Sequence, residues 1–170
     1  AQGLWGAGQM MFNKYMVITP ETTNLRNREE IFRLLRGLDP KRHLIHSEGI
    51  LDVLDHSAPN KGYGAKLAID LTTIDTHNEA VVTATLIKTI FTEHRQDEAI
   101  DIEALINDAE DARYVVLFDH GVEGMSAGDM LWIAAANTDP KRDITILGNR
   151  MVIDARSKRP GHGNNPARFP

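Results

Sequence analysis

The chain has 170 residues and a mass of 18.9 kDa, the size of one domain. With 42% hydrophobic and 25% charged residues it is typical of a soluble globular protein, which excludes collagen-like, coiled-coil and disordered chains. The lack of cysteine excludes disulfides, cysteine-ligated zinc, iron–sulfur clusters and thiol nucleophiles, and it fits a reducing cytoplasmic location. A net charge of −5 argues against general nucleic-acid binding, and no apolar run approaches the roughly 18 residues of a membrane span.

An internal repeat organises the sequence. The tetrapeptide Asp-Pro-Lys-Arg occurs at 39–42 and again at 139–142, an offset of 100. In the same order, residues 14–18 resemble residues 113–117 at an offset of 99. A third match follows further along each copy, where Ile-Asp recurs at an offset of 84. We therefore predict two tandem copies of one strand-helix-strand-strand unit, the second with shorter loops.

The first copy begins with a short apolar run that suits a strand buried on both faces. Apolar residues at helical spacing follow, and an Asp-Pro pair ends that helix because the residue before proline leaves the helical region. Two further strands complete the unit. The elements expected in the first copy are a strand at 15–18, a helix at 28–38 and strands at 43–46 and 66–69.

The joining stretch favours a helix at 80–91, although its valines and threonines also allow a strand, and a short helix is expected at 101–109. In the second copy, Ser126 is expected to cap the helix. The elements expected there are a strand at 114–118, a helix at 126–137 and strands at 144–147 and 150–153.

The alternation of strand, helix and strand predicts an α/β fold, with a layered mixed or mostly parallel sheet and flanking helices. We divide the chain into a first repeat unit at 1–75, a helical connector at 76–111 and a second repeat unit at 112–159. Residues 160–170, rich in proline and glycine, are expected to form an extended tail. The whole is expected to be one compact domain.

Several candidate sites are weak on chemical grounds. The sequence Asp55-His56-Ser57 suggests a hydrolase triad, but adjacent residues project in different directions and a triad is assembled from separate elements. The histidines at 43, 46 and 56 lack the spacing of a helical zinc site, so we interpret them as surface or hydrogen-bonded residues. Trp5 and Trp132 are interpreted as packing anchors.

Lys14 is the strongest candidate for a binding residue. It lies immediately before an expected strand, where its ammonium can reach an anion at the rim of the sheet. The alternative is that its stem packs against the core while the charge stays in water. Arg113 is its partner in the repeat.

Three segments in order, 4–17, 51–59 and 64–70, resemble the carboxy-terminal domain of UbiD-type decarboxylases, which include the polyprenyl-hydroxybenzoate carboxy-lyases. Family members carry a lysine-bearing strand, a Leu-Asp loop and a Gly-x-Lys-x-x-Ile-Asp finish. Residues 131–143 and 153–158 resemble the family's helix and its finish a second time. This doubling resembles the menaquinone-pathway branch of the family.

The resemblance implies non-oxidative decarboxylation of an aromatic carboxylic acid in ubiquinone or menaquinone biosynthesis. The full-length enzyme is then expected to use prenylated FMN with manganese and potassium, the cofactor acting as electron sink. In the family the catalytic residues and metal ligands lie in a preceding domain, so this chain is expected to be a fragment that is inactive alone and binds no cofactor by itself. Lys14 is the position at which the resemblance implies a contact to the cofactor phosphate.

The resemblance also implies an upstream flavin-binding domain in the same chain and a homo-oligomer. The alternative is a non-catalytic oligomerisation or regulatory module, favoured by the duplication and by the lack of a convergent acid–base set among these residues.

Overall fold

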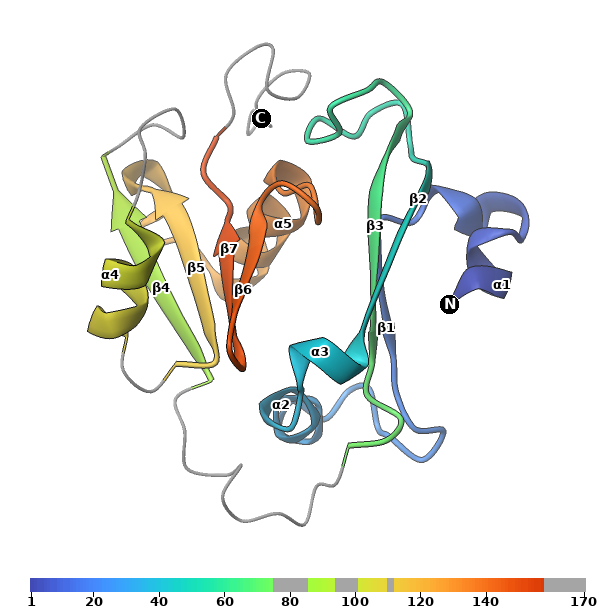
Figure 1. The fold of residues 1–170 in the computed structure, drawn as a ribbon, viewed down its shortest axis with the longest axis horizontal. Helices are drawn as coiled ribbons and strands as arrows, with labels where there is room; N and C mark the ends of the chain where they lie inside the picture. Colours follow the sequence, from blue (N-terminus) through green and yellow to red (C-terminus); the bar gives the residue numbers. More distant parts are fainter. Residues whose placement is uncertain (75–85, 94–100, 110–111, 158–170) are drawn as a thin grey trace.

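Two separate mixed sheets, with helices packed on and between them, make up the computed structural model, which describes residues 1–74, 86–93, 101–109 and 112–157 (Figure 1). The sequence-based expectation of an α/β fold with mixed sheets and flanking helices is therefore confirmed. The expected extended tail at 160–170 lies outside the described residues. No helix in the described part of the chain is long and apolar enough to cross a membrane.

The first sheet has the strand order β1-β3-β2. Its strands are β1 (Tyr15–Ile18), β2 (Leu44–Ile50) and β3 (Tyr63–Asp70). The central strand β3 pairs in parallel with β1 and antiparallel with β2. Its middle residues are buried because the sheet is covered on both faces there.

The second sheet has the strand order β4-β5-β7-β6. Its strands are β4 (Ile87–Thr92), β5 (Tyr114–Asp119), β6 (Ile144–Leu147) and β7 (Arg150–Asp154). Here β5 pairs in parallel with both β4 and β7, and β6 closes the sheet antiparallel to β7.

The strands β1, β2 and β3 share their topology and register with β5, β6 and β7. Tyr15 lies opposite Leu67, and Tyr114 lies opposite Met151. Counted along the chain, these pairs are offset by 99 and 84 residues, as in the sequence matches. The tandem origin of this likeness stays a prediction, but each set of strands has the order that the repeat implies.

The helices begin where the sequence supplies capping side chains. Asn27 accepts hydrogen bonds from two backbone N–H groups of the first turn of α2, Asp101 caps α4, and Ser126 caps α5. The helical elements are α1 (Gln2–Trp5), η1 (Gly8–Phe12), α2 (Arg28–Arg36), α3 (Pro40–His43), α4 (Ile102–Asp108), η3 (His120–Val122) and α5 (Ala127–Asn137).

The helix α2 lies between the two sheets (Figure 1). Leu34 of α2 and Leu38, which follows this helix, are buried in one cluster with Leu71, which follows β3, and with Tyr114 and Met151 of the second sheet. The two halves of the chain therefore share a hydrophobic core. Truncating one of these leucines to alanine costs about 2–5 kcal/mol in cores of this kind.

Three expectations about the elements were wrong. A helix was expected at 80–91, but residues 87–92 form the strand β4, because they pair with the edge of β5. Residues 80–85 lie outside the described residues. The first strand is not buried on both faces, since Val17 is 52% exposed on an edge strand. His43 belongs to the short helix α3 and not to the strand that follows it.

Candidate functional site

Lys14 lies immediately before β1, and backbone pairing fixes its position. Its carbonyl accepts a hydrogen bond from the N–H of Leu67 in β3, at 2.9 Å. Its side chain is 9% exposed. The ammonium is therefore not in open water, as it would be in the alternative in which only the stem packs against the core. The Nζ atom instead lies 2.9 Å from the Asp55 carboxylate and donates to the Ser57 hydroxyl at 2.8 Å.

Asp55 is held by the turn that it forms. Its Oδ1 accepts hydrogen bonds from the backbone N–H groups of Ser57, at 2.9 Å, and Ala58, at 3.2 Å. An aspartate that bonds the backbone two residues further on makes an Asx turn, for which its short side chain is suited. The turn points the other carboxylate oxygen at Lys14.

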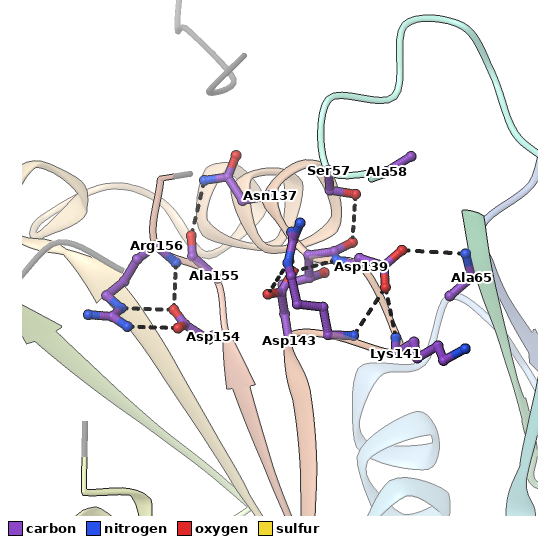
Figure 2. Close-up of polar contacts among 12 residues, drawn as sticks. Ser57, Ala58, Ala65, Asn137, Asp139, Lys141, Asp143, Asp154, Ala155 and Arg156 are labelled. Atoms are coloured by element: carbon purple, nitrogen blue, oxygen red, sulfur yellow. Dashed lines mark hydrogen bonds and ion pairs between the residues drawn. The ribbon is translucent and has the colours of Figure 1, made fainter. Parts of the chain in front are cut away.

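Ser57 links this loop to the second half of the chain. Its hydroxyl lies 2.8 Å from Oδ1 of Asp55. It also lies 2.9 Å from the carbonyl of Thr138, just beyond α5, a contact drawn as the dashed line from Ser57 in Figure 2. The same carbonyl accepts a hydrogen bond from the hydroxyl of Tyr15, at 3.0 Å. Because Ser57 accepts from Lys14 and has one proton, it donates to only one of its two acceptors at a time.

The pKa values of Lys14 and Asp55 follow from burial and from their contact. Burial alone raises the pKa of Asp55, but Lys14 and the donors of Ser57 together hold it below its usual range. The pKa of Lys14 is lowered, because loss of hydration outweighs the attraction of Asp55. Both pKa values are lowered, which favours the ionised form of Asp55 but the neutral form of Lys14. We take the pair as ionised at neutral pH, since an ionised Asp55 next to Nζ keeps the ammonium protonated.

A pocket of about 420 Å³ opens beside Lys14. It is walled by β1 and the segment before it, by the loop after β2, and by α5. The polar lining includes Lys14, Asp52, Asp55 and His56, and the lining residues from α5 are Trp132, Ala135 and Ala136. Trp132 is half exposed and lines this pocket, so it is not the packing anchor that we expected. Trp5 is buried, as expected of a packing anchor.

Chemically, the arrangement favours binding over catalysis. Ser57 is 1% exposed and its neighbour is an ammonium already paired with a carboxylate, so it lacks both the access and the base that a nucleophile needs. An ammonium has three N–H groups, and among the described residues two acceptors engage it. The Nζ atom also lies 5.4 Å from the centroid of the Tyr15 ring. Because Lys14 lines the pocket, its third N–H is the one that an anion bound there would engage.

Sequence reasoning singled out Lys14 as a candidate but missed the side chains that hold it. Asp55 and Ser57 were considered as part of a triad and set aside, yet both contact Lys14. The Asx-turn spacing of aspartate and serine was the signal that could have placed Asp55 in a turn. Nothing in the sequence placed Thr138 next to Ser57, because that contact joins residues 81 apart along the chain.

The corresponding position in the second half forms no such site. Arg113 donates to two backbone carbonyls, those of Leu38 and Asn149. The loop that carries Asp55 in the first half is replaced by the tight turn between β6 and β7, where Gly148 has a positive φ of 61°. Arg113 is therefore used to join the halves.

Comparisons with known proteins find a family model that matches the first part of the chain. Residues 1–71, which include Lys14, Asp55 and Ser57, match the family described as 3-octaprenyl-4-hydroxybenzoate carboxy-lyase C-terminal domain. An uncharacterised protein of Helicobacter pylori is 27% identical over 183 residues, covering 91% of this chain and 30% of the relative. An uncharacterised protein of Aquifex aeolicus is 34% identical over 74 residues, covering 43% of this chain and 15% of the relative.

The chain thus spans about 30% of the length of the Helicobacter relative. Among solved structures, the chain is similar to an evolved dimeric form of a UbiD-class enzyme from Pelotomaculum thermopropionicum in complex with prFMN. The alignment covers 67% of this chain and 39% of the chain of that enzyme. The TM-score is 0.38 and the sequence identity is 16%.

Proposed function

Because residues 1–71 match the family model of 3-octaprenyl-4-hydroxybenzoate carboxy-lyase C-terminal domains, we propose that this chain is the C-terminal domain of a UbiD-type decarboxylase. In this proposal the full-length protein removes carbon dioxide non-oxidatively from an aromatic carboxylic acid in quinone biosynthesis. Its cofactor is prenylated FMN, held with manganese and potassium. The family match over the segment that carries Lys14 is the observation that supports the proposal.

The residues of the Lys14 pocket fit the phosphate end of such a cofactor. Lys14 is a compact cation with one N–H beyond those that face Asp55 and Ser57, and the pocket beside it has a volume of about 420 Å³. When bound, prenylated FMN supplies the electron sink for decarboxylation. In the described part of the chain no group of three His, Cys, Asp or Glu side chains is arranged to hold a metal ion. We assign the metal ligands and the catalytic residues to the flavin-binding domain upstream.

The same pocket defines the face that this domain presents to the rest of the protein. If Lys14 reaches a cofactor held by another domain, that domain must approach the pocket. Apolar side chains that line the pocket are exposed in this chain: Leu54 is 73% exposed and Trp132 is 50% exposed. Exposed apolar groups of this kind mark interaction surfaces. Assembly and a cofactor contact are thus two roles of one face.

Activity is tested on the full-length protein that contains this domain. With reconstituted prenylated FMN, the proposal expects release of carbon dioxide from at least one aromatic carboxylic acid. Absence of turnover on a panel of hydroxybenzoates, cinnamates and bicyclic aromatic acids, with the cofactor verified by absorbance, would contradict it.

The role of Lys14 is tested by flavin occupancy. We expect Lys14→Ala in the full-length protein to retain less flavin than the wild type after gel filtration, because the phosphate loses a charge-assisted hydrogen bond. Lys61→Ala is the matched control, since Lys61 is exposed in the same loop as Asp55 and does not line the pocket. Equal occupancy in the two variants would remove Lys14 from the cofactor site.

A further inference from the structure

The pocket beside Lys14 contains two aspartates from one loop, and they differ in their contacts. Asp55 lies 2.9 Å from the Lys14 ammonium and is 11% exposed. Asp52 is exposed, and its Oδ1 accepts a hydrogen bond from the backbone N–H of Leu54 at 2.9 Å. Both carboxylates line the pocket. An anion that enters therefore meets one cation and two carboxylates, and the carboxylates would be expected to repel it.

We propose that Asp55 is a positioning residue that fixes the Lys14 ammonium at the wall of the pocket and so favours binding of a phosphate monoester there. This inference rests on the proposed function, in which Lys14 contacts the cofactor phosphate. It goes beyond that function because it assigns a carboxylate, which by charge alone would repel the ligand, a role in binding it.

The first step of the argument is rigidity. Three donors bind Oδ1 of Asp55 or lie within hydrogen-bond distance of it: the N–H groups of Ser57 and Ala58, and the Ser57 hydroxyl. Ser57 itself lies against the Thr138 carbonyl beyond α5. The carboxylate that faces Lys14 is thus anchored to both halves of the chain. It does not follow the lysine when a ligand arrives.

The second step is the conformational freedom of lysine. A lysine side chain has four rotatable bonds, and ordering it on binding opposes association. Asp55 and Ser57 occupy two of the three N–H directions of Lys14 before any ligand is present. The remaining N–H is thereby pre-oriented, so a phosphate oxygen that accepts it does not have to order the side chain.

The third step compares attraction with repulsion. Lys14 and the donors of the Asx turn reduce the field of Asp55 that a ligand experiences, and Asp55 reduces that of Lys14 in turn. The net contribution of Asp55 to phosphate binding is therefore the fixed orientation of the ammonium and not its charge. Among the described residues Asp52 makes no ion pair, so its effect on an anion is repulsive only. The two aspartates should therefore affect phosphate binding in opposite directions.

The test uses the full-length protein, with FMN and riboflavin as probes, because the two differ only in the phosphate group. Dissociation constants are measured by flavin fluorescence for the wild type and for Lys14→Ala, Asp55→Asn and Asp52→Asn. Asparagine keeps the side-chain oxygen that accepts from the backbone, so the Asx turn can persist in both aspartate variants.

We expect Lys14→Ala and Asp55→Asn each to weaken FMN binding by about tenfold, since each removes the fixed charge-assisted contact to the phosphate. Riboflavin binding should be unchanged in both variants. Asp52→Asn should tighten FMN binding by about twofold, because it removes a repulsive charge and nothing else. A variant that merely misfolds would weaken both flavins together, so the ratio of FMN to riboflavin affinity reports the phosphate contact alone.

The outcomes separate the two claims. If Lys14→Ala lowers the FMN to riboflavin ratio and Asp55→Asn raises it or leaves it unchanged, the positioning role of Asp55 is wrong while the Lys14 contact stands. The positioning role is also wrong if Asp52→Asn lowers the ratio as much as Asp55→Asn, since the effect is then one of the loop in general. If Lys14→Ala leaves the ratio unchanged, the phosphate contact fails and the role of Asp55 fails with it.

Discussion

Tyr15 and Tyr114, the first residues of β1 and β5, donate their hydroxyls across the boundary between the two halves in opposite directions. The hydroxyl of Tyr15 donates to the carbonyl of Thr138 beyond α5, at 3.0 Å. The hydroxyl of Tyr114 donates to the carbonyl of Leu35 in α2, at 2.9 Å. Each half thus binds the C-terminal end of the other half's helix. Reciprocal contacts of this kind are typical of isologous dimers, here within one chain.

Removing either hydroxyl should weaken the junction between the halves. We expect Tyr15→Phe and Tyr114→Phe each to lower the free energy of unfolding by about 1 kcal/mol, the usual net value of one buried hydrogen bond. The measurement is urea denaturation. Tyr63→Phe is the matched control, because Tyr63 is 47% exposed and its loss of a hydroxyl should change stability by less than about 0.5 kcal/mol. Equal effects in all three variants would show that the cross-boundary bonds contribute nothing.

The same two tyrosines predict how the protein responds to alkali. Burial raises the pKa of both hydroxyls above that of a free phenol. The hydrogen bond between the hydroxyls of Tyr15 and Thr138 opposes this rise for Tyr15, and the charge of Arg113 opposes it for Tyr114. In the unfolded chain they ionise near their ordinary pKa of 10.0. Above that pH the unfolded state therefore holds fewer protons than the folded state, and stability falls as pH rises.

This loss is absent from the phenylalanine variants. We expect the free energy of unfolding of the wild type to fall more steeply above pH 10.0 than that of the Tyr15→Phe, Tyr114→Phe double variant. Unfolding curves at a series of alkaline pH values measure the two slopes. Parallel slopes would mean that neither hydroxyl is protected by the fold.

Local signals in the sequence were sufficient for most elements of the fold. The strand at 15–18 has the predicted bounds, and so does the strand at 144–147, because each is a short β-branched run between clear breaks. Ser126 caps α5 as its position before an apolar run indicated. The strand β4 was missed because its sequence is ambiguous between helix and strand, and its pairing with β5 depends on a neighbour that local reasoning does not contain.

The site was less predictable than the fold. Lys14 could be singled out from its place before a strand. Its partners could not, since the ammonium is fixed by a loop 43 residues away, and that loop is fixed in turn by Thr138 in the other half. Contacts between segments so distant in the sequence depend on how the two sheets pack together. That packing follows from shape and not from periodicity.

Gly64 in β3 should not tolerate a side chain. A Cβ atom there would lie 2.9 Å from Cδ1 of Leu51 and 3.2 Å from Cβ of Ala58, and both residues are fully buried. We expect Gly64→Ala to lower the free energy of unfolding by about 1–3 kcal/mol through overpacking. Gly3→Ala is the matched control, because nothing lies within 4 Å of its Cβ position. Since Ala58 also donates to Asp55, Gly64→Ala should weaken FMN binding too, which the flavin titration measures.

The two Asp-Pro-Lys-Arg turns use different side chains for one task. In the first turn the backbone N–H of Asp39 donates to Nδ1 of His43, at 2.8 Å. In the second, the N–H of Asp139 donates to the carboxylate of Asp143, at 2.7 Å (Figure 2). Asp143 additionally binds the guanidinium of Arg142, at 2.7 Å and 2.8 Å. The acceptor four residues after the aspartate thus supports both turns, but the second acceptor carries a charge.

Replacing each acceptor with alanine should reveal this difference. Both variants leave the aspartate N–H without its partner, at a cost of about 1–3 kcal/mol for a buried donor. Asp143→Ala should cost more than His43→Ala, because it also removes a buried carboxylate, 1% exposed, from the Arg142 guanidinium. Asp143→Asn retains an acceptor for the N–H and should lie between the alanine variant and the wild type. The free energies of unfolding from urea denaturation give the order, and a larger loss for His43→Ala than for Asp143→Ala would contradict it.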